Sequence, residues 1–501
     1  MKRFLLNALF ACSACHATAP RTAPKAPSVP FHSVMTPLRG LLFALLALAQ
    51  LVSASGRPEP TSAYLFAHFT GESPKGEQIY FSISEDGLNW TDLNNSDPVL
   101  LSNVGEKGVR DPSLLRTADG KRFILLATDL RIASGKGWGT ATTRGSTSLV
   151  CWESVDLVNW SEPWRVDVAG TIPQAGCAWA PEAIYDEATD DYFVYWATIS
   201  PRDGERKARI YGAHTKDFRN FTKPELYIAR DGRDIIDTQI IEVKGAKHRY
   251  YRVSCDGQIT FEAGDSLFGD WERTGDLAYL GYTNKQVEGP ILFKINGQTK
   301  WGLLMDQYAS GRGYLPFVTT DLDNSRGFNV LGAADYSLGI SHKRHGGILN
   351  ITRSEYEALC AKWPSQPMLR IAPVATPERF VRHANFKLRI DPDVRPAADA
   401  CWRMVPGLAG GKDSLSIRSV NFPDRYITAT AAGIAMEPNN GSPAYAARAT
   451  FMQVPGLADP NATSFRLLNS PELYLREENS MLTVGPAHTQ AERTQATFLI
   501  Q

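Results

Sequence analysis

Short apolar runs alternate with polar, turn-forming segments between about residue 60 and residue 355. Examples of such runs, rich in β-branched and aromatic residues, are 122–127, 192–197 and 301–305. Runs of this length and composition are typical of β-strands. No long stretch with a 3.6-residue period competes with them. The hydrophobic pattern therefore predicts β structure throughout this region.

A polar segment that ends in an aromatic residue recurs five times along these strands. Its copies are residues 84–90, 154–160, 216–221, 267–271 and a degenerate copy at 321–328. The aromatic residues at 90, 160, 221, 271 and 328 lie 70, 61, 50 and 57 residues apart. This spacing suits one four-stranded propeller blade, with its loops, per step. We predict an all-β fold with a five-bladed β-propeller over residues 60–355.

Acidic residues stand near the start of several of the predicted strands. They are Asp111, Glu182, Asp237 and Glu288. The innermost strands of a propeller line its central channel, so residues at the same end of several such strands converge. We expect Asp111, Asp237 and Glu288 to meet there, although Asp before Pro is also a common turn residue and Asp234 is an alternative to Asp237. The segment 64–90 is expected to close the ring by pairing near 343–347.

Five short motifs in this region, taken in their order, resemble glycoside hydrolase family 43 over roughly residues 64–355. They are Asp-Pro-Ser-Leu at 111–114, Trp-Ala-Pro-Glu at 179–182, Asp-Thr-Gln-Ile at 237–240, Glu-Gly-Pro at 288–290 and Arg-His-Gly at 344–346. The resemblance implies hydrolysis with inversion by a base-activated water and a general acid, in which the carboxyl groups of the base and the acid lie ~6.5–9.5 Å apart. It implies Asp111 as the general base and Glu288 as the general acid. Asp237 would orient Glu288 and raise its pKa, because a nearby like charge disfavours ionisation.

The resemblance also suggests supporting residues for substrate binding. Trp179 would form an aromatic wall, with a core tryptophan as the alternative, and Arg312 would contact a sugar hydroxyl, with a solvated loop arginine as the alternative. Glu182 stands where family members often have Asp, which leaves its role open. His345 resembles a channel histidine that lies by a central water or a cation in some relatives. No metal ligand is assigned and no cofactor is required; a structural calcium near His345 is the one that the resemblance allows.

A second repeat fills the C-terminal region, after a predicted linker at 356–368. Pro377, Pro423 and Pro471 begin units 46 and 48 residues apart, and the first two units close on similar Pro-Gly-Leu segments at 406–408 and 455–457. Three units of this size predict a β-trefoil over 369–501, which resembles the arabinofuranosidase-B-type module, carbohydrate-binding module family 42.

In that family a His and an Asp of each repeat can form a sugar pocket. Only the first repeat has both, as His383 and Asp399, whereas Arg448 and Gln495 replace the Asp in the other two. Neither residue substitutes simply for a carboxylate that accepts two hydroxyls. We therefore expect binding at the first repeat and leave the other two open.

The first 54 residues read as an upstream extension followed by a signal peptide. Arg39 precedes an apolar run at 41–51 and a small-residue cleavage site at 52–54, which makes Met35 the expected start. This run is too short for a membrane-spanning helix of ~20 residues. We expect a secreted monomer.

Charge and cysteine content narrow the picture further. The formal net charge is zero, with 53 basic and 53 acidic residues, which argues against nucleic-acid or membrane-surface partners. The remaining cysteines allow at most two disulfides, with the pairing open; they are Cys151, Cys177, Cys255, Cys360 and Cys401.

Together these features predict an α-L-arabinofuranosidase that acts on arabinose-containing plant cell-wall polysaccharide, as in xylan degradation. The appended module favours arabinofuranose, because the catalytic motifs do not specify the sugar. A β-xylosidase, an arabinanase and an exo-β-1,3-galactanase of the same family are the alternatives within the enzyme class. A non-catalytic carbohydrate-binding protein is less favoured, because the chain keeps all three acids.

Overall fold

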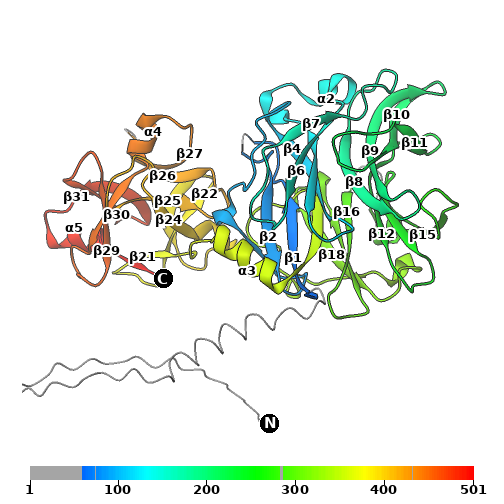
Figure 1. Ribbon diagram of the computed structural model, residues 1–501. Coiled ribbons are helices and arrows are strands. Elements are labelled where there is room, and N and C mark those ends of the chain that lie inside the picture. The colour runs from blue at the N-terminus through cyan, green and yellow to red at the C-terminus, as the bar shows by residue number, and fades with distance from the viewer. Residues whose placement is uncertain (1–58, 74, 283–285, 431–432) are drawn as a thin grey trace, which may run out of the picture. The chain divides into compact units, whose positions relative to one another are not determined.

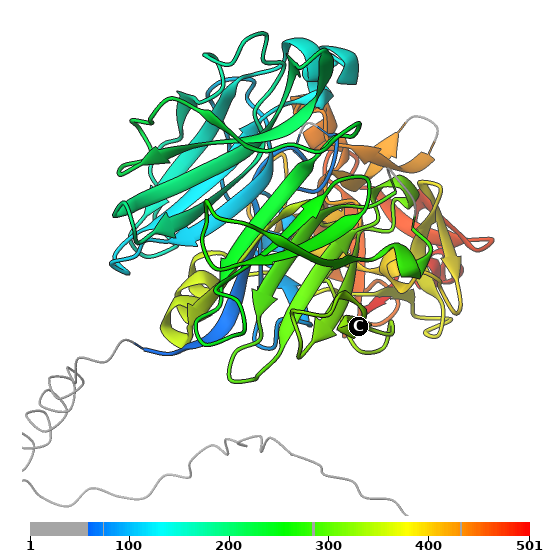
Figure 2. The ribbon, with the colours of Figure 1, turned by 90° about the vertical axis from the view of Figure 1, so that its right-hand side faces the viewer.

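Five four-stranded antiparallel sheets make up the first part of the computed structural model, which describes residues 59–73, 75–282, 286–430 and 433–501 (Figures 1 and 2). The first sheet, in the order β20-β1-β2-β3, contains β20 (Gly346–Thr352), β1 (Thr61–His68), β2 (Tyr80–Ser84) and β3 (Trp90–Asp92). The second contains β4 (Val109–Arg116), β5 (Phe123–Asp129), β6 (Ser148–Ser154) and β7 (Trp164–Asp167). The third contains β8 (Trp179–Asp186), β9 (Asp191–Arg202), β10 (Glu205–Thr215) and β11 (Glu225–Ile228).

The last two sheets follow the same up-and-down order. The fourth contains β12 (Ile236–Glu242), β13 (Tyr250–Cys255), β14 (Ile259–Gly264) and β15 (Glu272–Asp276). The fifth contains β16 (Glu288–Lys294), β17 (Trp301–Asp306), β18 (Tyr314–Thr319) and β19 (Asn329–Val330). Strands β20, β4, β8, β12 and β16 contact one another in that order and back to β20. The predicted five-bladed β-propeller is therefore confirmed, with these five strands innermost.

The ring closes where the sequence predicts, between the first strand and the last. β1 pairs antiparallel with β20, with Ala67 opposite Gly347 and His68 opposite Gly346. A buried ion pair also stabilises the closure of the ring. Lys343 Nζ lies 2.6 Å from Asp92 Oδ1, and both side chains are at most 2% exposed. Asp92 Oδ2 also accepts hydrogen bonds from the backbone amides of Ile340 and Ser341. The last segment of the propeller is thus tied to the first blade by both a strand ladder and a charge pair.

The aromatic repeat corresponds to the turn after the third strand of a blade. In the first copy, Asp86 Oδ1 accepts the backbone N–H groups of Leu88 and Asn89 at 2.8 and 2.7 Å. Asp156 and Asp217 make the same pair of bonds in the next two copies. Asp side chains stabilise turns in this way by replacing a backbone acceptor. The repeat is therefore clearest in the first three copies, because these turns use the same side-chain acceptor.

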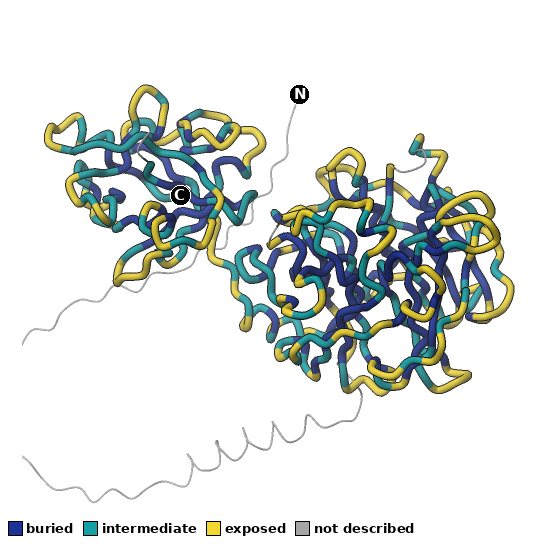
Figure 3. The backbone as a smooth tube through the Cα atoms, turned by 90° about the horizontal axis from the view of Figure 1, so that it is seen from above, coloured by how far each residue is buried: buried dark blue, intermediate teal, exposed yellow. Residues whose placement is uncertain are grey.

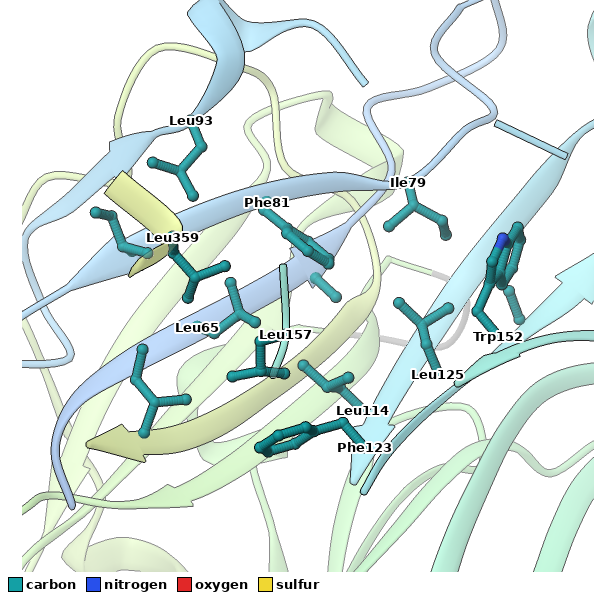
Figure 4. Close-up of a cluster of buried hydrophobic side chains, with 14 of the residues drawn as sticks. Leu65, Ile79, Phe81, Leu93, Leu114, Phe123, Leu125, Trp152, Leu157 and Leu359 are labelled. Atoms are coloured by element: carbon teal, nitrogen blue, oxygen red, sulfur yellow. The ribbon is translucent and has the colours of Figure 1, made fainter. Parts of the chain in front are cut away.

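A hydrophobic cluster between the first two blades extends to helix α3 (Arg353–Lys362), as Figure 4 shows. Leu359 is fully buried in this cluster, and Tyr356, Cys360 and Trp363 pack against it. Thr352 and Glu355 form a capping box that starts the helix. The predicted linker at 356–368 is thus wrong in its first half, which is a helix packed on the propeller. Its helical pattern is weak because Leu359 is the one fully buried residue of α3.

The C-terminal region forms a trefoil-like β domain with its own core (Figure 3). Its three hairpins are β22 (Phe380–Ala384) with β23 (Lys387–Asp391), β26 (Arg425–Thr430) with β27 (Gly433–Pro438), and β30 (Leu473–Glu478) with β31 (Met481–Pro486). The other pairs are β24 (Trp402–Pro406) with β25 (Ser414–Ser419), β28 (Phe451–Pro455) with β29 (Thr463–Leu467), and β21 (Ile371–Pro373) with β32 (Phe498–Ile500). This threefold arrangement agrees with the three sequence units.

Two predictions concern features beyond the strands. All five cysteines from Cys151 onward are free thiols in the described part of the chain. The predicted signal peptide and the start at Met35 lie outside the described residues.

Among the residues that the structure describes, no helix is both long enough and apolar enough to span a membrane. Short helices α2 (Trp138–Arg144), α4 (Pro443–Arg448) and α5 (Gln490–Gln495) lie between strands.

Candidate active site

The innermost strands of four blades share an irregularity at the same place. The pairing of β4, β8, β12 and β16 with the next strand shifts register near the start of each. One residue at each shift has a positive φ, namely Asp111 (48°), Ala180 (47°), Asp237 (49°) and Gly289 (55°). Asp111 and Asp237 thus occupy equivalent positions, whereas Glu288 comes one residue before that position and Glu182 two residues after it.

The three predicted catalytic acids come together at one end of the channel. Nδ1 of His345 lies 3.7 Å from Asp111 Oδ1 and 3.7 Å from Asp237 Oδ1. The other Asp237 oxygen accepts the backbone N–H of Gly289 at 2.9 Å, next to Glu288. Acids on three separate blades therefore share one neighbourhood, with His345 between two of them.

Asp111 is held from behind by a short hydrogen-bond chain. The Thr128 hydroxyl donates to Asp111 Oδ2 at 3.0 Å and accepts the backbone N–H of Ala180 at 2.8 Å. The Asp111 side chain is 16% exposed, against 8% for Asp237. Asp111 is therefore fixed in orientation and is the more accessible of the two to a water molecule.

Glu288 is bound to an arginine that it shares with a fourth acid. Arg344 Nη2 donates to Glu288 Oε1 at 2.8 Å, and Arg344 Nε donates to Asp306 Oδ2 at 2.7 Å. Asp306 ends β17 and lies opposite Glu288 in the strand pairing. The Arg344 guanidinium therefore lies between Glu288 and Asp306.

Burial shifts the acid–base behaviour of this cluster. Desolvation raises the pKa of Glu288, and the Asp237 and Asp306 carboxylates raise it further, while Arg344 lowers it. Desolvation and the Asp111 carboxylate likewise raise the pKa of Asp237. The sequence predicts a raised Glu288 pKa caused by Asp237; in the structure, burial is the larger cause and Asp237 adds to it.

A cavity of about 390 Å³ opens beside Glu288. Trp179 and Tyr308 lie on its wall, together with Arg233 and Asp256. The Trp179 ring meets the Trp138 ring edge to face, with centroids 6.1 Å apart. Trp179 therefore lies on the wall of this cavity, and its role in sugar binding stays a prediction. Of the three predicted catalytic acids, Glu288 is the one in the described lining.

Other predicted binding residues lie away from the walls of this cavity. Its described lining does not include Glu182, Arg312 or His345. Burial raises the pKa of Glu182 to about 8, and Arg312 is exposed in the loop before β18. Substrate binding by Glu182, Arg312 and His345 stays a prediction.

The sequence motifs do not include Asp306, and they include Arg344 without assigning it a function. A signal for Asp306 exists, because it directly follows the apolar run at 301–305. In an antiparallel blade, the end of the second strand meets the start of the first. An acid at the end of a second strand is therefore placed beside an acid at the start of the innermost strand.

The trefoil-like domain brings together its predicted pair. His383 Nε2 lies 3.3 Å from Asp399 Oδ1, and Asn421 Nδ2 donates to the same oxygen at 2.9 Å. Arg382 donates to Asp399 Oδ2 at 2.8 Å. The other ring nitrogen of His383 is buried and has no hydrogen-bond partner in the described structure.

The corresponding positions of the other two repeats have local partners. Arg448 pairs with Glu437 at 3.1 Å, and Gln495 accepts a hydrogen bond from Arg476 at 3.0 Å. Neither repeat presents the His and Asp pair of the first. Sugar binding at the first repeat stays a prediction, and binding at the other two repeats stays open.

One group of side chains that could bind a metal ion lies among the described residues, and it does not include His345. Among the described residues, Asp186, Asp191 and His214 offer ligand atoms within 4.8 Å of one another. Calcium prefers six to eight oxygen ligands, and the described neighbours of His345 within 3.7 Å include just two carboxylate oxygens. A structural calcium near His345 stays a prediction.

Two family models match the chain. One, described as a probable glycosyl hydrolase domain related to glycosyl hydrolase family 43, matches residues 59–357. The other, described as the alpha-L-arabinofuranosidase B (ABFB) domain, matches residues 369–500.

Individual relatives match parts of the chain. An alpha-L-arabinofuranosidase of Bifidobacterium longum is 29% identical over 275 residues, which cover 50% of this chain and 25% of that protein. Alpha-L-arabinofuranosidase 43 of Humicola insolens is 38% identical over 112 residues, which cover 21% of this chain and 22% of that protein. The chain thus spans about a quarter of the length of these relatives. The solved exo-beta-1,3-galactanase of Clostridium thermocellum is 12% identical, with a TM-score of 0.38 over 82% of this chain and 98% of that one.

Proposed function

Because the chain belongs to the family of probable glycosyl hydrolases related to family 43, and carries an ABFB domain, we propose that it is a secreted α-L-arabinofuranosidase acting with inversion. The substrate would be an arabinose-containing plant cell-wall polysaccharide. The names of the matching relatives support this choice of sugar. Secretion is supported by the apolar run at 41–51 and by a partial relative of Streptomyces avermitilis that is named an extracellular exo-alpha-(1->5)-L-arabinofuranosidase.

The convergence of Asp111, Asp237 and Glu288 is the observation that supports this proposal most directly. Glu288 borders the cavity, and burial favours its protonated form. It would give its proton to the glycosidic oxygen as the bond to the anomeric carbon breaks. Asp111, oriented by Thr128, would take a proton from the water whose oxygen bonds to that carbon from the opposite face.

Asp237 would act on Glu288 rather than on the substrate. Its Oδ2 holds the backbone N–H of Gly289, which fixes the direction in which Glu288 leaves the strand. Its charge also disfavours ionisation of Glu288. After one cycle Glu288 has lost a proton and Asp111 has gained one, and exchange with solvent restores both. No step requires a metal ion.

The trefoil-like domain would hold the enzyme on its polymeric substrate. His383 and Asp399 form a small polar site beside the Phe386 and Phe422 rings, whose centroids lie 6.0 and 5.2 Å from that of His383. Aromatic faces and a carboxylate suit a sugar ring with its hydroxyls. We expect arabinofuranosyl units to bind here.

Substrate screening with purified protein tests the proposal. The account predicts release of arabinose from an aryl α-L-arabinofuranoside and from arabinan, arabinoxylan or arabinogalactan, and loss of this activity in Glu288→Gln. Preferential hydrolysis of an aryl β-xyloside or β-galactoside would replace the arabinofuranosidase assignment. Inactivity of the wild-type protein on every substrate, together with binding of a polysaccharide, would favour a non-catalytic carbohydrate-binding protein.

A further inference from the structure

Asp306 hydrogen bonds to the same guanidinium as Glu288, the candidate proton donor, and it is not one of the three acids that the sequence predicts. Asp306 is fully buried, and its Oδ2 accepts from Arg344 Nε at 2.7 Å. Its Oδ1 is also buried and has no hydrogen-bond partner in the described part of the structure. The same guanidinium donates to Glu288 Oε1 at 2.8 Å. Two carboxyl groups therefore share one cation.

This sharing matters because of what a general acid must do. Glu288 has to carry a proton before it can give one to the leaving oxygen. A guanidinium bonded to Glu288 opposes this, since an opposite charge at hydrogen-bond distance favours the carboxylate. An ionised Asp306 carboxylate would neutralise the charge of Arg344. Glu288 could then stay protonated, because the guanidinium already has an ionised partner.

We propose that Asp306 is a positioning residue for the reaction: by neutralising Arg344 through Nε, it allows Glu288 to remain bound to Nη2 of the same guanidinium while carrying the proton that the substrate receives. The inference rests on the proposed role of Glu288 as general acid. Glu288 borders the cavity and Asp306 does not. The proton that a substrate can reach is therefore the one on Glu288.

Other titratable groups also surround this pair. Asp237 raises the pKa of Glu288 after burial, and Asp111 adds a smaller effect in the same direction. Burial raises the pKa of Asp306 above its usual value, although Arg344, His342 and His345 act to lower it. Cys255 and Tyr308 also interact electrostatically with Glu288, and Tyr314 interacts with Asp306. Of the groups named, Asp306 and Glu288 hydrogen bond to the Arg344 side chain.

The first test replaces Asp306 by the isosteric Asn and measures kcat/KM against pH on an aryl arabinofuranoside with a poor leaving group. Asp306→Asn keeps an acceptor for Arg344 Nε but removes the charge. Arg344 then acts on Glu288 alone, so the alkaline limb of the profile should move to lower pH by about 1–3 units. A substrate with a good leaving group, which needs less protonation, should lose less activity at neutral pH.

A double variant separates this electrostatic role from a purely structural one. Asp306→Asn combined with Arg344→Gln removes both charges, so the alkaline limb should return toward that of the wild type even if kcat is lower. Glu355→Gln is the matched control, because Glu355 also forms an acid–arginine pair, with Arg116 at 2.7 Å, but on helix α3. Its profile should keep the wild-type limb.

Each outcome decides the inference. The inference is overturned if the alkaline limb of kcat/KM against pH does not move in Asp306→Asn, or if it moves equally in Glu355→Gln. It is also overturned if the limb of the double variant stays at the same low pH as that of Asp306→Asn. If Glu288→Gln retains full activity, the proposed function itself is wrong. If Glu288→Gln is inactive and the Asp306→Asn limb is unmoved, the role of Asp306 alone is wrong.

Discussion

Burial, together with the Asp237 and Asp306 carboxylates, raises the pKa of Glu288, while Arg344 lowers it. Protonation of Glu288 therefore depends on several blades at once: Asp237 comes from β12, Asp306 from β17 and Arg344 from the segment before β20. Asp111 is placed differently, because the Thr128 hydroxyl donates a hydrogen bond to its Oδ2. Two carboxylates of the same chemical type are thus suited to opposite roles by their surroundings.

Glu288→Gln should lower kcat/KM by about 10²–10⁴ on substrates with poor leaving groups, because general acid catalysis contributes that much. The loss should be much smaller with a dinitrophenyl leaving group, which departs without protonation. Steady-state kinetics on a series of aryl arabinofuranosides measures both. An equal loss across the series would contradict the role of Glu288 as proton donor.

Asp111→Asn should lower kcat/KM to a similar extent on every member of the same series. The base acts on water, so the quality of the leaving group does not replace it. The two variants should therefore differ in the slope of log(kcat/KM) against the pKa of the leaving group. A steep slope for Asp111→Asn and a flat one for Glu288→Gln would reverse the assignment.

Sequence motifs could predict Asp111, Asp237 and Glu288 because each stands in a short, recognisable segment. They could not place Glu182, because the strand irregularity puts Ala180 at the position of Asp111 and Asp237. At such a register shift, backbone conformation rather than residue type decides which residue of the motif takes a given position. Asp306 was missed because a single acid after an apolar run also suits an ordinary turn.

At the scale of elements, the ring joint combines a strand pair with the Asp92–Lys343 ion pair. Burial by itself raises the pKa of Asp92, but Lys343 and the surrounding hydrogen bonds outweigh it and hold that pKa below its usual value. A folded-state pKa below the unfolded one stabilises the fold at pH above the unfolded pKa of ~3.9. This stability is lost as the pH falls through the folded-state value.

Asp92→Asn should therefore lower the free energy of unfolding at pH 7 by about 3–5 kcal/mol, because it leaves the Lys343 charge buried without its partner. Urea unfolding of both proteins between pH 2 and pH 7 measures this. The difference between them should shrink as the pH falls below about 4. Asp231→Asn, a change at an exposed acid, should leave the wild-type stability unchanged. A difference that is independent of pH would contradict an electrostatic origin.

Helix α3 shows where element prediction from sequence reaches its limit. Its capping box at Thr352 and Glu355 is readable, but the helix buries one residue fully and so has little hydrophobic pattern. Leu359→Ala should destabilise the propeller by about 2–5 kcal/mol, since Leu359 is fully buried in the cluster between the first two blades. Denaturant unfolding checks this. A change below 0.5 kcal/mol would mean that α3 contributes no more than a surface segment.

For the whole molecule, repeats were the informative signal in both regions. Five copies of the turn motif predict five blades, and in the first three copies an Asp side chain forms the same turn. Three Pro-initiated units predicted the trefoil-like domain because its hairpins recur in threefold order. The sugar that is cleaved depends on the shape of the cavity wall, which brings together segments from several blades, and sequence spacing does not fix that shape.

His383→Gln should weaken binding to soluble arabinan while leaving kcat/KM on an aryl arabinofuranoside unchanged, because the aryl substrate does not need the trefoil-like domain. Affinity electrophoresis measures binding and a colorimetric assay measures activity. Arg448→Gln, at the position in the second repeat that corresponds to Asp399, is the matched control and should bind as the wild type does. Equal binding by all three proteins would exclude the first-repeat site as the arabinan contact.

The central claim, inverting hydrolysis of an α-L-arabinofuranoside, is tested most directly by ¹H NMR of the first sugar released. We predict that wild-type protein releases β-L-arabinofuranose before mutarotation, because water activated by Asp111 attacks opposite to the bond that Glu288 protonates. Initial appearance of the α-anomer, or release of no arabinose, would contradict the account.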